Sequence, residues 1–192
     1  MRVLAAAVAS ALVLACATAT SARTGPPVSP ALAPVVELSA DRLATAELIA
    51  AAKWHSGEPV EAPEREAQVL AQAERSARLL GGDPAFALAF MRDQIEANKV
   101  IQRGRHADWY AHPERRPRRA PDLAGARADL DRLTPALVGA LADAGPGAPG
   151  CEAELAGAAH RVAAERGLDG SGRTALAVSL ASVCAGWAQP AT

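Results

Sequence analysis

A chain of 192 residues, half of which are hydrophobic, can form one domain with a substantial core but is short for two. The formal net charge of −1 excludes the strongly basic character that is typical of proteins that bind nucleic acids or anionic membrane surfaces. Aromatic residues make up only 3% of the chain, whereas alanine and leucine dominate. Because alanine and leucine favour helix, the composition predicts an all-α fold.

The N-terminus is predicted to be an export signal that is not part of the fold. After Arg2, residues 3–15 form an unbroken run of apolar and small side chains. This run is too short for a membrane span of about 20 residues and is typical of a signal peptide. Cleavage after Ala19 or Ala22 would release a soluble periplasmic or secreted protein. Alternatively, the residues that end at Cys16 resemble a bacterial lipobox, and a lipidated Cys16 would anchor the exported chain to a membrane.

Proline and glycine divide the following segment into a linker and three helices. Residues 23–34 contain four prolines and are predicted to be a linker. A long helix is expected over residues 35–55, and a second helix should begin near Pro63 and end at a Gly-Gly pair. Asp83 followed by proline is the pattern of a helix N-cap and first helical residue. It predicts a third helix over residues 84–110.

The C-terminal half begins with a basic, proline-rich loop over residues 112–122. Its four arginines could bind an anion or a nucleic acid, but no aromatic residues are interleaved with them, so a solvated loop is expected. A fourth helix should begin near Asp122, and Pro135 is expected to kink or split it. Two shorter helices are predicted over residues 151–166 and 171–187.

The cysteine count agrees with export. When Cys16 is assigned to the signal, Cys151 and Cys184 are the two cysteines that remain. An oxidising compartment would pair them, and the disulfide would clamp the last two helices together. Two buried free thiols are the alternative that the sequence leaves open.

Polar residues at helical spacing indicate an anion site. The histidines are isolated and no phosphate-loop or dinucleotide motif is present, so no metal or cofactor site is expected. Arg42 and Lys53 are three helical turns apart on a stripe that is otherwise apolar, and buried cations need an anionic partner. Asn98 and Gln102 are four residues apart and could meet one ligand, and Arg65 lies in the first turn of its helix. The same spacing also fits cations that reach solvent and amides on the surface.

Two segments carry a family resemblance. Residues 52–70 resemble the junction between the first two helices of the all-helical chorismate mutases, and residues 93–102 resemble their third-helix signature. The similarity runs from about residue 35 to 109, which is the three-helix core of the family. The exported, gamma-type subclass adds a C-terminal helical extension with one disulfide, and Arg127 and the cysteine pair match this pattern.

The resemblance implies a specific organisation and site. The chain would be a bundle of about six helices over residues 35–190, after a signal over residues 1–22 and the linker. The arginines would hold the two carboxylates of chorismate, while Lys53 and Gln102 would stabilise its ether oxygen. Glu66 falls where some members bind the ring hydroxyl, but Ala62 stands where many have an acidic residue. The substrate-binding positions that the resemblance implies are Arg42, Lys53, Arg65, Glu66, Asn98, Gln102 and Arg127.

The function implied by the resemblance is the cofactor-free rearrangement of chorismate to prephenate, with catalytic roles for Arg42, Lys53 and Gln102. The pocket should lie within one chain, and relatives suggest a homodimer. The first alternative is an exported, non-catalytic helical protein that binds an anionic ligand or a protein partner, and Ala62 is its best support. The second is a structural envelope protein that is anchored through Cys16.

Overall fold

The computed structural model describes residues 32–145 and 150–184. The predicted export signal, Cys16 and most of the predicted linker lie outside these ranges. Every regular element in the described residues is helical, which confirms the all-α prediction. The elements are α1 (Ala33–Ser56), α2 (Pro63–Leu79), α3 (Pro84–Ala111), the 3-10 helix η1 (Pro113–Arg115), α4 (Leu123–Ala144), α5 (Cys151–Glu165) and α6 (Gly170–Ser179).

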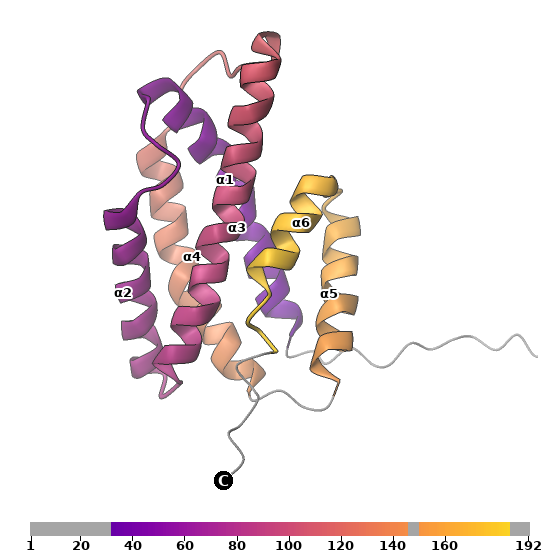
Figure 1. The fold of residues 1–192 in the computed structure, drawn as a ribbon. Helices are drawn as coiled ribbons and strands as arrows, with labels where there is room; N and C mark the ends of the chain where they lie inside the picture. Colours follow the sequence, from indigo (N-terminus) through magenta and orange to yellow (C-terminus); the bar gives the residue numbers. More distant parts are fainter. Residues whose placement is uncertain (1–31, 146–149, 185–192) are drawn as a thin grey trace, which may run out of the picture.

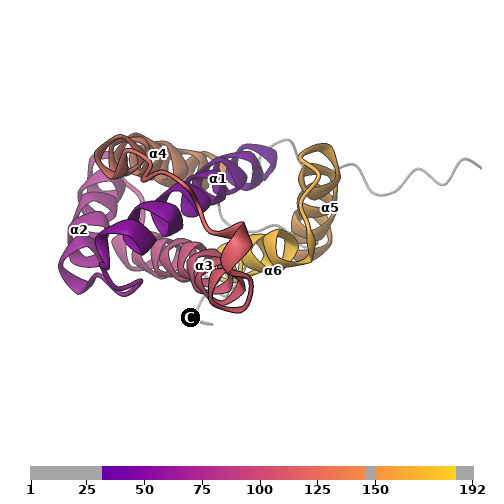
Figure 2. The same ribbon diagram turned by 90° about the horizontal axis from the view of Figure 1, so that it is seen from above.

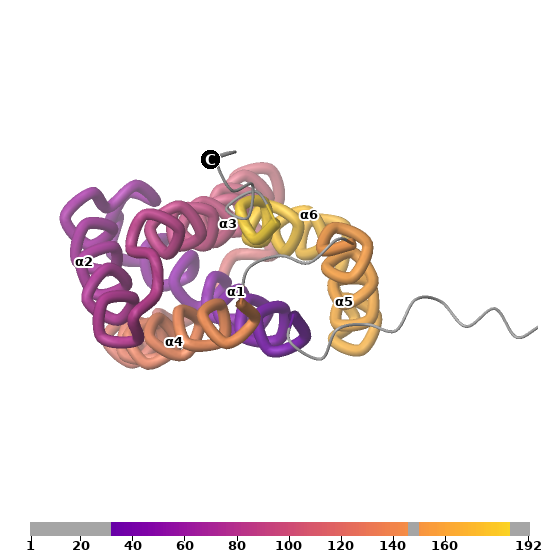
Figure 3. Tube along the Cα trace, turned by 90° about the horizontal axis from the view of Figure 1, so that it is seen from below, coloured from indigo at the N-terminus to yellow at the C-terminus, as the bar shows by residue number. Residues whose placement is uncertain are grey.

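The helices pack around α1, which lies between α3 and α4 (Figure 1). Seen along the bundle, α2 closes one side against α3 and α4 (Figure 2). At the opposite side α5 and α6 pack against α1 and α3 (Figure 3). The core of the bundle is therefore covered by α2 on one side and by the C-terminal helices α5 and α6 on the opposite side (Figure 2).

The first three helices begin and end close to the predicted positions because their caps are encoded locally. The Asp83 side chain accepts a hydrogen bond from the Ala85 N–H at 2.8 Å and so caps α3, as expected. Gly57 ends α1 with a φ of 74°, a left-handed conformation that favours glycine, and its N–H donates to the Lys53 carbonyl. Helix α1 begins two residues earlier than predicted, because Leu32 is buried in the core and holds the preceding turn against the bundle.

Helix α4 runs through Pro135 without interruption, so of the two predicted outcomes, a kink or a split, the split is wrong. Proline has no N–H, and the Asp131 carbonyl one turn earlier therefore lacks its usual helical donor. The side-chain amide of Gln72 on α2 donates to that carbonyl at 2.8 Å. The neighbouring helix thus satisfies the acceptor that the proline leaves unpaired, and α4 continues.

The last helix is shorter than predicted. Helix α6 ends at Ser179, residues 180–184 form turns, and residues 185–187 of the prediction lie outside the described chain. A carboxylate oxygen of Asp93 on α3 accepts the Ser182 N–H at 2.7 Å, and Cys184 is bonded to Cys151. These contacts fix the chain in turns, although buried apolar residues continue along this segment.

A disulfide joins the C-terminal helices to each other, and a buried amide joins them to the rest of the bundle. Cys151 and Cys184 form the predicted bond, with a Cα–Cα distance of 5.9 Å. The fully buried Gln94 amide donates to the Ser39 hydroxyl at 2.7 Å and to the Ser179 carbonyl at 3.0 Å, which connects α3 to α1 and α6. None of the helices in the described residues is both long and apolar enough to cross a membrane.

Candidate active site

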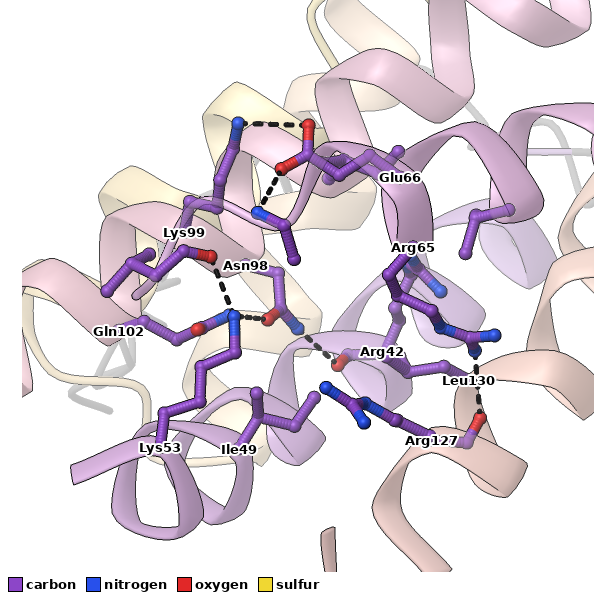
Figure 4. Close-up of a pocket in the computed structure, with 14 residues that line it drawn as sticks. Arg42, Ile49, Lys53, Arg65, Glu66, Asn98, Lys99, Gln102, Arg127 and Leu130 are labelled. Atoms are coloured by element: carbon purple, nitrogen blue, oxygen red, sulfur yellow. Dashed lines mark hydrogen bonds and ion pairs between the residues drawn. The ribbon is translucent and has the colours of Figure 1, made fainter. Parts of the chain in front are cut away.

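A pocket opens between α1, α2, α3 and α4 (Figure 4). It contains about 510 Å³ of atom-free space, part of which is open to solvent. All seven residues that the sequence analysis assigned to substrate binding line it, so residues far apart in the chain meet at one place. The lining residues are Arg42, Ile49, Lys53, Val60, Ala62, Arg65, Glu66, Val69, Ile95, Asn98, Lys99, Gln102, Arg127 and Leu130.

Arg42 is the most deeply buried charge of the pocket, with only 2% of its surface exposed. Its Nε and Nη1 atoms are buried and have no hydrogen-bond partner. Burial, together with the charge of Arg65, lowers the pKa of Arg42 to about 10, while Asp131 opposes this effect. A guanidinium with unpaired donors in an apolar setting is strongly disposed to bind an anion that enters the pocket.

Lys53 lies on the same helix as Arg42 and also lines the pocket. Only 5% of its surface is exposed. Its ammonium donates to the Val60 carbonyl at 2.7 Å, which ties the connection between α1 and α2 to the pocket. Burial and the positive charge of Arg127 lower the pKa of Lys53, although Glu58 partly offsets them. Both predicted cations of the α1 stripe are therefore held inside the protein and do not reach solvent.

Arg65 and Arg127 already contact carboxylates of the chain itself. Arg65 donates to Asp131 at 2.6 Å and to the Arg127 carbonyl at 3.4 Å, which orients its guanidinium across the pocket from α2 to α4. The Nε atom of Arg65 is buried without a partner. Arg127 donates to the Glu58 carboxylate at 3.0 Å. Each of these arginines can therefore coordinate a carboxylate group in its present position.

Asn98 and Gln102 lie side by side, as their spacing predicted, but they hold each other. The Gln102 amide donates to the Asn98 side-chain oxygen at 2.6 Å, and the Asn98 amide donates to the Arg42 carbonyl at 3.4 Å. Gln102 keeps its second amide hydrogen for another acceptor, because an amide nitrogen carries two. Asn98 thus orients Gln102 and links it to the backbone of α1.

Glu66 lies on the opposite rim, where sequence reasoning missed its partner. One carboxylate oxygen accepts the Ala62 N–H at 3.2 Å, and the other is 3.3 Å from the Lys99 ammonium. Lys99 also contacts Glu96 at 3.2 Å. Lys99 lies three residues before Gln102 on the same helix, and this spacing is the signal that could have placed Lys99 at the pocket.

The pocket has a surplus of positive charge. Its lining includes five cations and one carboxylate, Glu66, and the floor is formed by apolar side chains such as Ile49 and Leu130. Such a site is suited to a small ligand with more than one negative charge and an apolar ring. Among the described residues there is no group of three or more His, Cys, Asp or Glu side chains that could hold a metal ion.

The basic loop lies away from these lining residues. Its side chains are largely exposed, as predicted, and two of its arginines contact the end of α3. Arg115 pairs with Asp108 at 2.9 Å, while Arg116 donates to the Trp109 carbonyl and lies 5.4 Å from the centre of the Trp54 ring. These contacts fix the loop to the bundle and do not add cations to the pocket.

The sequence matches known proteins over most of its described length. The family model described as chorismate mutase type II matches residues 33–103. The secreted chorismate mutase of Mycolicibacterium smegmatis is 36% identical over 155 residues, which cover 80% of this chain and 86% of that protein. The secreted chorismate mutase of Mycobacterium tuberculosis is 32% identical over 167 residues, covering 83% and 84%.

Solved structures agree with the sequence matches. The chorismate mutase from Burkholderia thailandensis superposes with a TM-score of 0.76 at 39% identity, covering 80% of this chain and 99% of that one. The chorismate mutase from Burkholderia phymatum gives 0.76 at 34% identity, covering 80% and 96%. The secreted chorismate mutase from Yersinia pestis, at 23% identity and a TM-score of 0.64, shares the fold.

Proposed function

The chain belongs to the type II chorismate mutase family, and on this premise we propose that the pocket between α1 and α4 binds chorismate and rearranges it to prephenate. An enzyme of this family is an isomerase. The observation that carries the assignment to this pocket is Arg42, a buried guanidinium with two unpaired nitrogen atoms. A carboxylate of the substrate would supply the missing acceptors and compensate the buried charge.

Two carboxylates must be held for the substrate to adopt the compact conformation that reacts. Arg42 and Arg127 bind one of them in this proposal, and Arg65 contributes to the other side of the pocket. Asp131 supports this role because it holds the Arg65 guanidinium in one orientation before the substrate enters. Fixing the reactive conformer in this way supplies part of the reduction in the barrier, since the rearrangement needs no bimolecular encounter.

Lys53 and Gln102 stabilise the charge that develops during the reaction. As the ether C–O bond of chorismate breaks, negative charge grows on the oxygen. We assign the Lys53 ammonium and the second amide hydrogen of Gln102 to that oxygen. The hydrogen bond from Gln102 to Asn98 supports this assignment, because it fixes the amide plane before the substrate binds. Preorganised donors in a site of low dielectric constant stabilise a transition state without reorganisation during the reaction.

The decisive experiment mixes purified protein with chorismate and follows the loss of chorismate absorbance and the formation of prephenate. We expect rapid conversion by the wild type and little by Arg42→Ala. Arg75→Ala, which removes an exposed arginine outside the pocket, is the matched control and should retain full activity. Binding of chorismate without conversion would instead assign the chain to the alternative class of non-catalytic binding proteins.

The proposed site is complete within one chain, and we include the family's homodimer as a separate expectation. Support for an intramolecular site comes from the lining residues, which extend from α1 to Leu130 of the same polypeptide. Inactive Arg42→Ala and Arg127→Ala chains should therefore stay inactive when they are mixed. Recovery of activity in the mixture would mean that two chains share a pocket. Sedimentation analysis of the wild type measures the oligomeric state independently.

The proposal also includes export. The matched relatives from two mycobacterial species are named as secreted enzymes, and the Cys151–Cys184 bond is typical of an oxidising compartment. We expect the mature protein to begin after Ala19 or Ala22, or at a lipidated Cys16. Intact-mass analysis of protein from the native cell distinguishes these products. A full-length cytoplasmic species would contradict both.

A further inference from the structure

An ionic network runs along the rim of the pocket and contains a cation, Lys99, to which the proposed function gives no role. Lys99 contacts Glu66 of α2 at 3.3 Å and Glu96 of its own helix at 3.2 Å. Arg103 continues the network, since it contacts Glu96 at 2.6 Å and Glu61 at 2.8 Å. The network thus joins α2, α3 and the segment between α1 and α2. Figure 4 shows its contact between Lys99 and Glu66 at the edge of the pocket.

Glu66 creates a problem for a site that must bind two carboxylates. It is the one carboxylate among the residues that line the pocket. Burial and the charge of Arg127 lower the pKa of Lys53, and the negative charge of Glu66 is among those that partly offset this effect, so Glu66 lies close enough to act on the buried cation. Glutamate has three rotatable side-chain bonds, so an unrestrained Glu66 could turn toward the buried cations. It would then occupy, from within the chain, donors that the substrate needs.

The contacts of Lys99 prevent this rotation. Its ammonium holds one oxygen of Glu66, while the Ala62 N–H holds the other. The Lys99 side chain is only 14% exposed, so water weakens its contact with Glu66 less than it weakens a surface ion pair. Burial alone would lower the pKa of Lys99, but the hydrogen bonds that its ammonium donates to Glu96 and Glu66 raise the pKa above the ordinary value, so this side chain stays positively charged.

We propose that Lys99 is a positioning residue for substrate binding, which holds the Glu66 carboxylate at the rim and keeps it from competing with chorismate for the buried cations. This inference rests on the proposed function. Lys99 acts through Glu66 and has no direct contact with the substrate. Its effect is on binding, because the competition ends once the substrate carboxylates occupy the pocket.

The test is a double-mutant cycle that measures kcat and KM for chorismate. In the wild-type background, Lys99→Met should raise KM about tenfold and change kcat little. The substitution removes the charged hydrogen bond that holds Glu66, and the freed carboxylate then competes with the substrate. In a Glu66→Gln background the same substitution should change KM by less than about twofold, because no competing carboxylate remains. Lys99→Arg, which keeps the cation, should restore a KM close to that of the wild type.

Arg103→Met is the matched control. Arg103 lies on the same helix and shares Glu96 with Lys99, but it has no contact with Glu66, so its removal should leave KM unchanged. Circular dichroism verifies that each variant is folded, and Lys99→Ala replaces Lys99→Met if the latter aggregates. An equal rise in KM in both Glu66 backgrounds would overturn the proposal, because Lys99 would then act on the substrate directly. A wild-type chain that does not convert chorismate would instead reject the proposed function.

Discussion

Arg42 and Arg166 place the same side chain in opposite environments at the two sides of the bundle. In the pocket, burial lowers the pKa of Arg42 to about 10, and two of its nitrogen atoms have no partner. At the other side, Arg166 contacts Glu37 at 2.7 Å and Asp41 at 2.6 Å, and these hydrogen bonds raise its pKa. One arginine is left with unused donors, and the other pairs with two carboxylates.

The difference extends to the regions around these arginines. Five buried side-chain polar atoms in the described residues lack a partner, and four of them belong to the pocket residues Arg42, Arg65 and Gln102. The C-terminal clamp, which we define as α5, α6 and residues 180–184, is instead closed by a disulfide and by the hydrogen bonds of Asp93 and Gln94. The unpaired buried atoms of the pocket therefore lower the free energy of unfolding but leave donors for a ligand, while the contacts of the clamp raise it.

The sharpest test of this contrast substitutes methionine for each arginine in turn. Arg42→Met should lower kcat/KM by about 10³-fold, because a carboxylate contact and transition-state charge stabilisation are lost together. Its melting temperature should not fall, since the substitution removes a buried charge without a partner. Arg166→Met should keep activity and lose about 1 kcal/mol or less of unfolding free energy, because its ion pairs are partly exposed.

Activity assays and thermal melts of the two variants decide the outcome. The contrast fails if Arg42→Met unfolds several degrees below the wild type while Arg166→Met abolishes turnover. In that case the buried guanidinium would be a structural element and the paired one a functional element.

Removal of the disulfide tests the clamp itself. The bond closes a loop with a sequence separation of 33 residues, and the double substitution Cys151→Ala and Cys184→Ala should lower the free energy of unfolding by about 3–4 kcal/mol. Activity below the melting transition should be retained, because neither cysteine lines the pocket. Urea unfolding and steady-state kinetics measure the two effects. A reduced kcat at full folding would show that the clamp also shapes the pocket.

The variant Gln102→Glu tests the assignment of the ether oxygen. A glutamate can donate a hydrogen bond only while it is protonated, and an ionised carboxylate would repel the growing negative charge. At neutral pH this variant should lose about 10²-fold in kcat, and activity should return as the pH falls through the pKa of the new carboxyl group. The wild type should show no such dependence, because glutamine does not titrate. If the pH profile of Gln102→Glu matches that of the wild type from pH 5 to 9, Gln102 does not contact the ether oxygen.

The smallest expected effect is a shift of the alkaline limit of activity. Lys53 must be protonated to act, and burial and Arg127 lower its pKa, so kcat/KM should decline at a lower pH than for an ordinary lysine. The bound dianion favours the charged lysine, and the decline of kcat should therefore lie at higher pH than that of kcat/KM. Glu58→Gln removes a charge that raises the pKa of Lys53 and should move the limit of kcat/KM to lower pH by less than about one unit. A limit that moves to higher pH would contradict the electrostatic account of the pocket.

Much of the fold was predictable because helix signals are local. The N-cap at Asp83 is at its predicted position, and α1 ends at Ser56, one residue after its predicted end, where Gly57 caps it. Both caps act through backbone groups only a few residues away. That the seven proposed binding residues line one pocket was predictable for a different reason. Family resemblance supplied them as a set, whereas spacing alone left open whether Arg42 and Lys53 face the interior or solvent.

The features that the sequence analysis missed or misjudged depend on contacts between helices. Pro135 predicts a possible split when α4 is considered alone, but α4 is continuous and Gln72 from α2 satisfies the freed carbonyl. The apolar pattern predicted a helix to residue 187, but Asp93 and the disulfide hold residues 180–184 in turns. In both cases a contact from another helix decides the backbone conformation against the preference of the local sequence.

The sequence by itself determined the helical class of the protein, the positions of most helix ends and the types of charge available to bind an anion. Only the tertiary structure decided which of those charges are paired and which remain available. Two nitrogen atoms of the Arg42 guanidinium are left without a hydrogen-bond partner, whereas Lys99 and Glu66, which are 33 positions apart, restrain each other at the rim. The reason is physical: helix propensity and capping act within one or two turns, but the pairing and burial of a charge depend on neighbours that only the packing of distant helices supplies.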